Sequence, residues 1–507
     1  MATKPYHVPI SNHGQSTEQA QPTRSNLVRP GRFGLLFPEL SGVPWTTGSE
    51  AGDLDACRRL AAAMHAAAPQ GVGTIAAGFT YLGQFVDHDM TFDPTSIGEN
   101  AVDLGDLVNF RTPALDLDCL YGSGPADQPF LYRRESGLRE FVVGPVQRPA
   151  DGAPGADDAT VGELDGALYD LPRACDGLST RTAIIGDKRN DENLVVAQLH
   201  RTMLHFHNAV CLEFPAMSFK QVRQVVMHHY QRVLLNEFLP AIVGKQALED
   251  ALDRLQYYLI GPGQLATQPF MPLEFAGAAY RFGHSMVRST YHFNKVFTPG
   301  TPFAPFLFAF TGNGGFFGGT RYPSNWLLDW RQFFPGLGAA PQPALAIDPG
   351  VIPELLIPGR PGVDPTPLAE LNLIRGSRHY KLPAGQAVAA RMGLPKLEAH
   401  ELESGIAGEA VRELGLGLHT PLWFYILKES EIRAGGRHLG PVGATIVAEV
   451  FVGLLRDDPE SVLSQPDAAP RLPAADGAFK MADLFRFIES HKGQGNIPAR
   501  GVINPLG

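Results

Sequence analysis

The residues of this chain that are best suited to chemistry begin with a histidine between two aspartates. The sequence Gly-Gln-Phe-Val-Asp-His-Asp occupies residues 83–89, so His88 is flanked by Asp87 and Asp89, and Gln84 lies four positions upstream. An unperturbed imidazole titrates near neutral pH, which makes His88 a candidate for general acid–base catalysis. An arbitrary Asp-His-Asp is more often a solvated surface turn, so the motif alone does not decide the function.

A cation further along the chain is a candidate partner for this histidine. Arg189 lies in Gly-Asp-Lys-Arg-Asn-Asp-Glu-Asn, residues 186–193. An arginine beside a distal base would stabilise the charge that develops when the O–O bond of a peroxide breaks. A charged loop before a helix would have the same composition, because acidic residues such as Asp191 and Glu192 favour a helix N-terminus. That simpler interpretation explains the acidic residues, but it does not explain why this segment occurs together with the motif at residues 83–89.

A second histidine, in Tyr-Arg-Phe-Gly-His at residues 280–284, is a candidate metal ligand. Taken alone, His284 is more often a hydrogen-bonded core residue. As a ligand it would hold a haem iron on the face opposite His88, and its other ring nitrogen would need an acceptor. Asn372, in Leu-Asn-Leu-Ile-Arg at residues 371–375, could supply its side-chain carbonyl as that acceptor.

An oxygen-rich segment, Thr-Pro-Ala-Leu-Asp-Leu-Asp, lies between these motifs. Its oxygen donors are Thr112, the Ala114 carbonyl, Asp116 and Asp118. In an extended loop these groups would point the same way, and Asp89 would add a third carboxylate. Hard oxygen donors with two or three carboxylates suit Ca²⁺. The alternative for this segment by itself is an exposed acidic turn.

Taken together and in this order, the motifs resemble those of the animal-type haem peroxidases. This is the peroxidase–cyclooxygenase superfamily, with myeloperoxidase and lactoperoxidase as its best-known members. The resemblance rests on residues 83–89, 112–118 followed by Leu-Tyr-Gly-Ser at 120–123, Gly-Asp-x-Arg-x-x-Glu at 186–192, Tyr-Arg-Phe-Gly-His at 280–284 and Leu-Asn-x-x-Arg at 371–375. Five ordered motifs are far more specific than any one of them, and they outweigh the simpler interpretations above.

The resemblance implies a role for each residue at the centre of a haem site. His88 matches the distal histidine, and Gln84 matches the distal glutamine that is associated with halide access. Arg189 matches the catalytic arginine. His284 matches the proximal ligand of the haem iron, with Asn372 as its partner.

The resemblance also implies contacts at the edge of the haem. Arg375 and Arg281 match residues that contact the haem propionates. Asp87 and Glu192 match the two carboxylates that form ester bonds to haem methyl groups. The expected cofactor is therefore haem b, with ester links through these two carboxylates.

A calcium site and several departures from the family complete the comparison. The implied calcium ligands are Asp89, Thr112, the Ala114 carbonyl, Asp116 and Asp118, although a serine is common where Asp118 stands. Asn193 stands where myeloperoxidase has the methionine that forms a sulfonium link, so a third covalent bond to haem is not expected. Residues 377–381 deviate from the usual Arg-Asp-His-Gly, and the cysteine pattern of the secreted mammalian enzymes is absent. A compact, microbial-type catalytic domain is therefore expected.

The elements that must position these residues are expected to be mainly helices. Helical spacing predicts helices over residues 78–90, from Glu192 to about Leu212, from a Ser218/Gln221 capping box to Pro240, and around residues 446–454. Strand-like alternation is scarce. Residues 150–166 are acidic and rich in Gly and Ala, and residues 293–343 are dense in Phe, Gly and Pro. Both segments are expected to form loops, the second of them packed over a core.

The composition is that of a large globular domain with long connections. The chain has 507 residues, of which 44% are hydrophobic, so it can bury a large core. Its 55 glycines and 43 prolines exceed the usual share and indicate irregular segments. We expect an N-terminal arm, residues 1–30, and one mainly α catalytic domain, residues 31–507, with the helical haem peroxidase fold and long irregular loops.

The net charge and the hydropathy pattern narrow the partners. A net charge of −10 argues against nucleic acid and anionic membranes, which attract basic surfaces. No apolar stretch approaches the roughly 20 residues of a membrane-spanning helix. Residues 1–26 are polar and contain no secretory signal, so we expect a cytoplasmic location or export without a cleaved signal peptide.

The residues and the resemblance together predict a haem-dependent peroxidase that uses H₂O₂. His88 and Arg189 would promote cleavage of the peroxide to give an oxyferryl haem, which would oxidise a halide, thiocyanate or a phenol. Two alternatives stay open. A fatty-acid dioxygenase of the superfamily would place a radical tyrosine three residues before the proximal histidine, where this chain has Arg281, with Tyr280 one position further away. A non-catalytic haem-binding or adhesion protein would not need His88, Arg189 and His284 together.

Overall fold

The computed structural model describes most of the chain, and every candidate site residue predicted from the sequence lies in the described part. The described residues are 31–40, 45, 47–67, 71–93, 107–174, 182–260, 266, 268–298, 321–357, 366–466 and 470–507. The predicted N-terminal arm, residues 1–30, lies outside them. The cysteines Cys57, Cys119 and Cys211 are buried free thiols.

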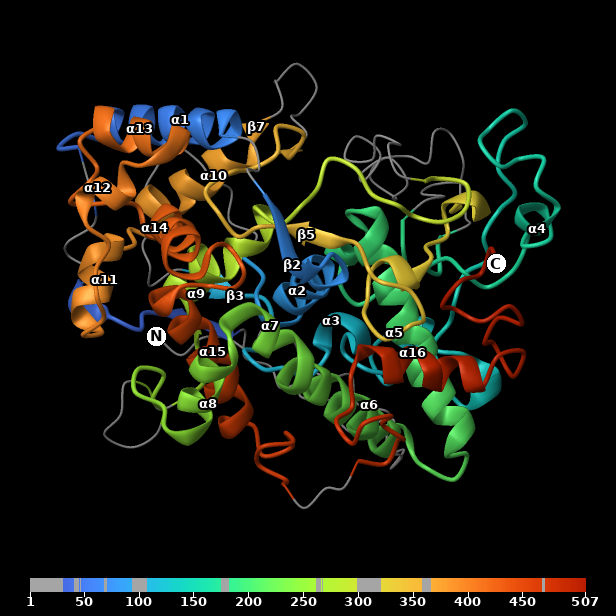
Figure 1. Cartoon of the computed structure of the whole chain (residues 1–507). Helices are drawn as coiled ribbons and strands as arrows, with labels where there is room; N and C mark the ends of the chain where they lie inside the picture. Colours follow the sequence, from blue (N-terminus) through green and yellow to red (C-terminus); the bar gives the residue numbers. More distant parts are fainter. Residues whose placement is uncertain are drawn as a thin grey trace.

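Helices dominate the structure, as the sequence predicted (Figure 1). The longer ones are α1 (Glu50–Ala66), α2 (Gly78–Met90), α5 (Leu194–Glu213), α6 (Phe219–Val233), α15 (Pro441–Asp457) and α16 (Met481–Ser490). The shorter ones are α3 (Asp118–Tyr121), α4 (Ala159–Gly162), α7 (Leu239–Val243), α8 (Lys245–Asp253), α9 (Leu273–Gly277), α10 (Leu368–Ile374), α11 (Gly385–Arg391), α12 (Ala399–Leu402), α13 (Gly405–Glu413) and α14 (Leu422–Glu429). Single turns η7 (Lys188–Asp191), η9 (Ala279–His284) and η14 (Arg375–His379) carry site residues.

The strands are short and join segments that are distant in the sequence. They are β1 (Gly31–Gly34), β2 (Val72–Ala76), β3 (Val108–Asn109), β4 (Met271–Pro272), β5 (Pro343–Leu345), β6 (Leu356–Ile357) and β7 (Thr366–Pro367). β1 pairs antiparallel with β3 and parallel with β4, where Phe33 lies opposite Met271. β2 pairs with β5, and β6 with β7, both antiparallel. These pairings hold the chain entering and leaving the helical core.

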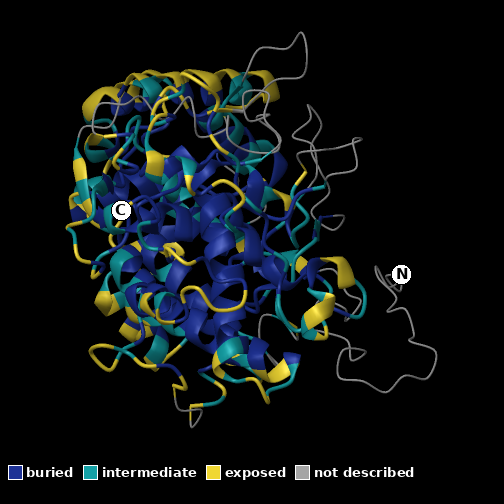
Figure 2. Ribbon diagram, turned by 90° about the vertical axis from the view of Figure 1, so that its right-hand side faces the viewer, coloured by how far each residue is buried: buried dark blue, intermediate teal, exposed yellow. Residues whose placement is uncertain are grey.

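Helix α5 runs through the centre of the molecule. Every residue of α5 from Leu194 to Cys211 is buried, and Figure 2 shows buried residues filling the interior behind an exposed outer layer. A helix that is buried on all sides must satisfy its polar side chains internally. His207 and His205 meet the backbone carbonyls of other segments at 2.7 and 3.0 Å, and Asn208 bonds the backbone of Phe141 in both directions. α2, α6 and α16 pack against this central helix.

Helix α6 begins as its sequence predicts but ends at Val233. The Ser218 hydroxyl accepts from the backbone N–H of Gln221, whose side chain accepts from the Ser218 N–H in return. The rod continues through a wider, π-type turn, η8 (Leu234–Phe238), into α7. That wider turn precedes Pro240, which has no N–H to continue an ordinary ladder. The predicted helix therefore extends up to and slightly past this proline.

Helix α2 covers the predicted range, residues 78–90, and is deeply buried. Its first residue, Gly78, lies against the Phe333 carbonyl, and a Cβ there would come within 2.6 Å of that oxygen. Glycine is therefore required for the helix to approach this backbone. α2 contacts α5, η7 and η9. It therefore packs against the turn that carries Arg189 and the turn that carries His284.

Two loop predictions need comment. Residues 150–166 are not loop throughout, because they contain the one-turn helix α4. The Asp158 side chain caps this helix by accepting from the Thr160 N–H, and the helix buries its residue Val161. Asp158 is a good N-cap, and the composition of the segment concealed it. Of residues 293–343, the described parts are irregular and aromatic, with Phe297 stacked on Trp326 at a ring distance of 3.8 Å. Among the described helices, none is long and apolar enough to cross a membrane.

Candidate active site

One cavity of about 650 Å³ brings together residues from α2, η7, η9, α10 and η14. The predicted site residues that line it are Gln84, Asp87, His88, Arg189, Glu192, Arg281, His284, Asn372 and Arg375. Apolar side chains complete the wall, among them Phe33, Phe92, Phe282, Val287, Leu355, Leu368 and Leu371. An apolar cavity of this size with a few polar groups is typical of a cofactor site.

Helix α2 presents one polar face to this cavity. Gln84, Asp87, His88 and Thr91 recur at helical spacing and all line the cavity. The residues between them, such as Phe85, are buried in the core. A helical period at residues 83–91 therefore brings the acid–base histidine, the glutamine and one carboxylate to the same side.

A hydrogen-bond chain fixes the tautomer of His88. The Nδ1 atom of His88 lies 2.8 Å from Oδ1 of Asn190, and the Nδ2 atom of Asn190 lies 2.9 Å from Nδ1 of His200. Since the amide nitrogen only donates, His200 accepts through Nδ1, and His88 donates its Nδ1–H to the amide oxygen. Burial and the nearby Arg189 lower the pKa of His88 to about 4. At neutral pH the Nε2 lone pair of His88 is thus free to accept a proton.

Arg189 reaches the cavity with its guanidinium already anchored. It pairs with Asp187 at 2.7 Å, donates to the backbone carbonyl of His88 at 3.0 Å, and lies 4.4 Å from the ring centre of Phe92. Arg111 bonds the same carboxylate. Although burial opposes it, these two cations hold the pKa of Asp187 well below its usual range. The result is a rigid cationic cluster beside the distal histidine.

His284, in η9, is hydrogen-bonded to Asn372, in α10. The Asn372 amide faces it with its nitrogen rather than with the carbonyl oxygen that was expected. The Nδ2 atom of Asn372 lies 2.7 Å from Nδ1 of His284, and its carbonyl oxygen accepts from Arg281 at 3.4 Å. The carbonyl faces Arg281 because the guanidinium is the stronger donor. A half-turn of the amide would place the carbonyl on His284. Burial and the neighbouring Arg281 and Arg375 lower the pKa of His284 to about 3.

Arg281 and Arg375, which form no ion pair with a carboxylate of the described residues, lie on the same cavity. Burial, reinforced by Arg375, lowers the pKa of Arg281 to about 10, and its Nε donates to the Ala276 carbonyl. The Nε atom of Arg375 is buried without a hydrogen-bond partner among the described residues. Buried cations need anionic partners, so this wall of the cavity suits a ligand with carboxylates.

Asp87 and Glu192 both line the cavity, from α2 and from the residue after η7. The Thr91 hydroxyl donates to Asp87 at 2.9 Å. Burial raises the pKa of Glu192 to about 7, although the nearby Arg189 opposes this rise. Both carboxylates are therefore placed to react with, or contact, a group in the cavity.

The predicted calcium ligands come together beneath α2. Carboxylate oxygens of Asp89, Asp116 and Asp118 lie within 4.8 Å of one another. The loop that carries the latter two is not extended as expected: it turns at Leu117, whose φ is +61°. This turn, rather than the i, i+4, i+6 spacing, directs the two side chains inward. The Thr112 hydroxyl donates to Asp118 at 3.1 Å.

One oxygen of each carboxylate accepts no hydrogen bond. The Oδ1 atoms of Asp89, Asp116 and Asp118 are buried and have no hydrogen-bond partner among the described residues, although Oδ1 of Asp118 lies 3.8 Å from Nε of Arg111. The second oxygens are used: Oδ2 of Asp89 accepts from the Leu117 N–H and from Tyr230, both at 3.2 Å. Burial and mutual repulsion raise the pKa of Asp89 and of Asp118. Three buried oxygens that accept no hydrogen bond fit a hard cation.

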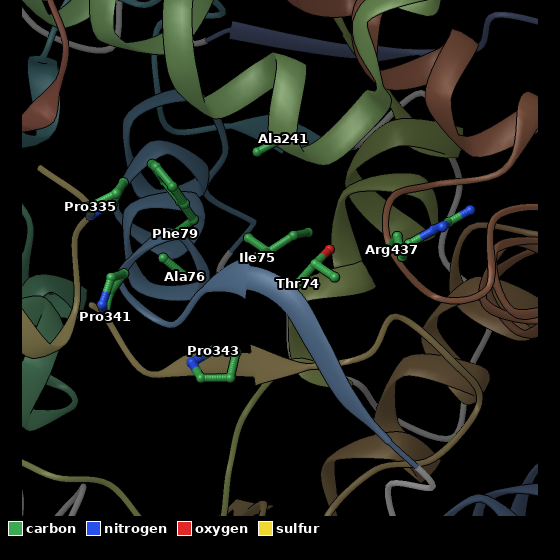
Figure 3. Close-up of a pocket in the computed structure, with 9 residues that line it drawn as sticks. All are labelled: Thr74, Ile75, Ala76, Phe79, Ala241, Pro335, Pro341, Pro343 and Arg437. Atoms are coloured by element: carbon green, nitrogen blue, oxygen red, sulfur yellow. The ribbon is translucent and has the colours of Figure 1, made fainter.

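A second cavity, of about 310 Å³, lies away from this site and carries no comparable chemistry. Figure 3 shows that Ile75, Ala76, Phe79 and three prolines make up much of its wall, with Arg437 at one edge. Phe79, in the first turn of α2, lines this smaller cavity, whereas the next two residues, Thr80 and Tyr81, line the large cavity. The smaller cavity therefore lies on the far side of the first turn of α2.

The sequence matches the family model described as animal haem peroxidase over residues 98–306. Heme peroxidase 2 of Caenorhabditis elegans is 24% identical over 429 residues, which cover 74% of this chain and 58% of that protein. Human thyroid peroxidase is 25% identical over 384 residues, 69% of this chain and 38% of that protein. Over residues 98–306, this chain is therefore similar to the animal haem peroxidases. It spans little more than half the length of the first of these relatives.

Solved structures show the same fold. Peroxidase A from Dictyostelium discoideum superposes with a TM-score of 0.59 at 16% identity, over 94% of this chain and 92% of that one. Fatty acid alpha-dioxygenase from Oryza sativa gives 0.52 at 14% identity, over 83% and 74%. The predicted mainly α, helical haem peroxidase fold is confirmed.

The match to the family model includes only part of the site. Arg189, Glu192 and His284 lie within residues 98–306, whereas His88 and Asn372 lie outside this range. The structure nevertheless places all five on one cavity. Haem is the group expected for the family, and the cavity fits it: a histidine on each of two segments, apolar walls, and the buried Nε of Arg375 with no partner in the described structure.

Several residues at the site were not predicted from the sequence. They are Arg111, Asp187, Asn190, His200 and Tyr230, together with Arg223, which donates to the Asp116 carbonyl at 3.1 Å. Asp187 belongs to the motif Gly-Asp-x-Arg and could have been singled out by its position two residues before Arg189. His200 and Tyr230 lie on buried helices, where a polar residue has no signal in the sequence that distinguishes a partner of the site from a core residue.

Proposed function

We propose that this chain is a haem peroxidase that uses H₂O₂ to oxidise a small donor. One observation carries the proposal: a single cavity receives a neutral histidine of fixed tautomer, an anchored arginine, and a second histidine held by Asn372. A base, a cation and an axial ligand are the parts that peroxide activation at a haem requires.

The residues divide the work as follows. Bound haem would supply the redox-active iron. Nε2 of His284 could ligate it only with the ring proton on Nδ1, so the Asn372 amide would turn to present its carbonyl oxygen to that Nδ1–H. His88 would accept a proton from H₂O₂ on its free Nε2 and return it to the departing oxygen. Arg189, fixed by Asp187, would stabilise the negative charge on the oxygen atoms without reorganising. Gln84 would offer a hydrogen bond to the donor that is oxidised.

The edge of the site would hold the cofactor in place. Arg281 and Arg375 would pair with the propionates, which gives their buried charges partners. Asp87 and Glu192 would form ester bonds to haem methyl groups; each bond would replace one C–H bond of a methyl group in a two-electron oxidation that consumes one H₂O₂. Asp89, Asp116 and Asp118, with Thr112 and the Ala114 carbonyl, would bind Ca²⁺, as their free oxygens suggest.

The donor would be a halide, thiocyanate or a phenol. A fatty-acid dioxygenase is the second candidate, because such an enzyme is among the solved structures with this fold. Against it, Arg281 occupies the position three residues before His284, and its guanidinium bonds the Ala276 carbonyl and Asn372. No tyrosine stands there to carry a radical.

Substitution of the two histidines tests the proposal. His284→Ala should lose or misligate haem, measured by the Soret band. His88→Ala should retain haem but react with H₂O₂ about 10²-fold more slowly or worse, if general acid–base catalysis is lost. His419→Ala, at an exposed site, is the control and should match wild type. A His88 variant with normal peroxide reactivity would refute the assignment, and bromide, thiocyanate, guaiacol and linoleate added separately would identify the donor.

A further inference from the structure

Asn193 is a polar side chain of the cavity whose hydrogen bonds are fully specified. It precedes α5 with extended backbone, φ −141° and ψ 160°, and its Oδ1 accepts from the N–H groups of Val195 and Val196 at 3.1 and 2.9 Å. It is the N-cap of the central helix. Its Nδ2 donates to Oε1 of Gln84 at 2.8 Å.

These contacts determine which way the Gln84 amide points. Backbone N–H groups only donate, so the Asn193 atom that faces Val195 and Val196 must be its oxygen. The atom that faces Gln84 is then the nitrogen, and the Gln84 atom opposite must be an acceptor. The Gln84 N–H₂ group is left as the free end of the amide. Gln84 and Asn193 both line the large cavity.

We propose that Asn193 is a positioning residue that locks Gln84 with its N–H₂ group toward the cavity, so that the site selects a donor that accepts hydrogen bonds, such as a small anion. This inference rests on the proposed peroxidase function. The carbonyl and amino ends of a glutamine amide are nearly the same size, and an unrestrained side chain presents either one. The helix α5 cap removes that freedom.

Two substitutions keep the side-chain cap of α5 and change the hydrogen bond to Gln84. Asn193→Ser retains a side-chain oxygen for the α5 N–H groups but offers Gln84 no fixed donor. Asn193→Asp also caps α5, but its second oxygen accepts, so the Gln84 amide should turn and present its carbonyl to the cavity. Because aspartate also adds a negative charge, each substitution is repeated in a Gln84→Leu background. The double-mutant cycle separates the effect of charge from the effect of the turned amide.

The first readout is thiocyanate binding to the haem-loaded protein, followed as a Soret shift. Loss of a hydrogen bond to a charged group predicts affinity about tenfold weaker in Asn193→Asp, and a smaller loss in Asn193→Ser. Much of the aspartate effect should vanish in the Gln84→Leu background. Equal losses in both backgrounds, or unchanged affinity in both single variants, would overturn the proposal. So would a wild-type protein that binds haem and reacts with H₂O₂ but does not bind thiocyanate.

The second readout is thermal unfolding of the same variants without haem. Gln84→Leu removes the acceptor of the buried Asn193 Nδ2, so Gln84→Leu and Asn193→Ser should be non-additive. Additive effects would refute the link between the two side chains. A wild-type protein that neither retains haem nor reacts with H₂O₂ would instead refute the proposed function, while this cycle would still decide whether Asn193 and Gln84 are coupled.

Discussion

At the scale of residues, the distal histidine owes its chemical state to a turn rather than to its own motif. Asp87 and Asp89 flank His88 in the sequence, yet the partner that fixes its tautomer is Asn190, which in turn donates to His200. Asn190 is fully buried, as is His200. A burial that keeps the imidazole neutral and a partner that keeps Nε2 free are both needed for a base that works at neutral pH.

The first prediction concerns Asn190. Asn190→Ala should slow the reaction of the haem-loaded protein with H₂O₂ by up to about 10²-fold, the lower end of what general acid–base catalysis contributes, because the His88 ring can rotate and change tautomer. Stopped-flow absorbance gives the rate. Asn190→Asp keeps an acceptor for the His88 Nδ1–H and should recover part of it. A wild-type rate in the alanine variant would contradict the role.

The second prediction concerns the haem esters. Asp87 and Glu192 line the cavity, and an ester would remove a negative charge that is costly to bury beside an apolar macrocycle. Fresh protein should hold part of its haem covalently, with the fraction rising after small doses of H₂O₂. Denaturing acid extraction and mass spectrometry measure it. The Asp87→Ala/Glu192→Ala variant should release unmodified haem, and full release from treated wild type would rule out the esters.

At the scale of elements, α2 couples two sites through one backbone segment. His88 faces the cavity, and Asp89, the next residue, joins the carboxylate cluster with Asp116 and Asp118. The cluster also packs against α6, through Tyr230. A cation there would therefore tie α2 to the loop before α3 and fix the height of His88 in the cavity.

The third prediction follows from this coupling. Chelation of Ca²⁺, or Asp116→Ala, should lower the melting temperature and the peroxidase activity together, because the ion neutralises three buried carboxylates. Calorimetry and a donor assay measure the two effects, and metal analysis should find bound Ca²⁺. Asp55→Ala, on the exposed face of α1, is the control and should change neither. Active protein without Ca²⁺ would contradict the site.

At the scale of the whole molecule, contacts over long sequence distances close the fold around the cavity. Glu274, in α9, is fully buried and accepts from the N–H groups of Leu36 and Phe37 at 3.0 and 3.1 Å. It thereby anchors the chain after β1 to the segment that leads to His284. Most of the buried apolar residues that the structure describes form one hydrophobic core cluster.

The fourth prediction concerns the pH dependence of this anchor. Burial raises the pKa of Glu274 from 4.5 to about 7. A raised folded-state pKa gives stability that is present below pH 4.5 and is lost as the pH rises through 7. The unfolding free energy of wild type, relative to Glu274→Gln, should fall by about 3 kcal/mol across that window. Urea unfolding between pH 4.5 and 8 measures it.

A control variant and one contradicting outcome complete this test of the Glu274 pKa. The exposed Glu249→Gln should show no such trend relative to wild type. A difference between wild type and Glu274→Gln that does not change with pH would mean that Glu274 titrates normally.

The sequence by itself determined the helices and the chemistry of the site residues. The period of α2, the capping box of α6 and the ordered motifs each depend on neighbours a few positions apart, which a sequence shows directly. His88, Arg189 and His284 were therefore singled out, and the structure places all three on one cavity. The location of the protein and the identity of its donor stay predictions.

Only the tertiary structure decided how those side chains are oriented. The tautomer of His88 depends on His200, the anchoring of Arg189 on the backbone carbonyl of His88, and the polarity of Gln84 on Asn193. It also reversed the expected amide of Asn372 and bent the loop before α3 at Leu117. Hydrogen-bond partners come from whichever elements pack together, and packing joins residues whose separation in the sequence carries no periodic signal.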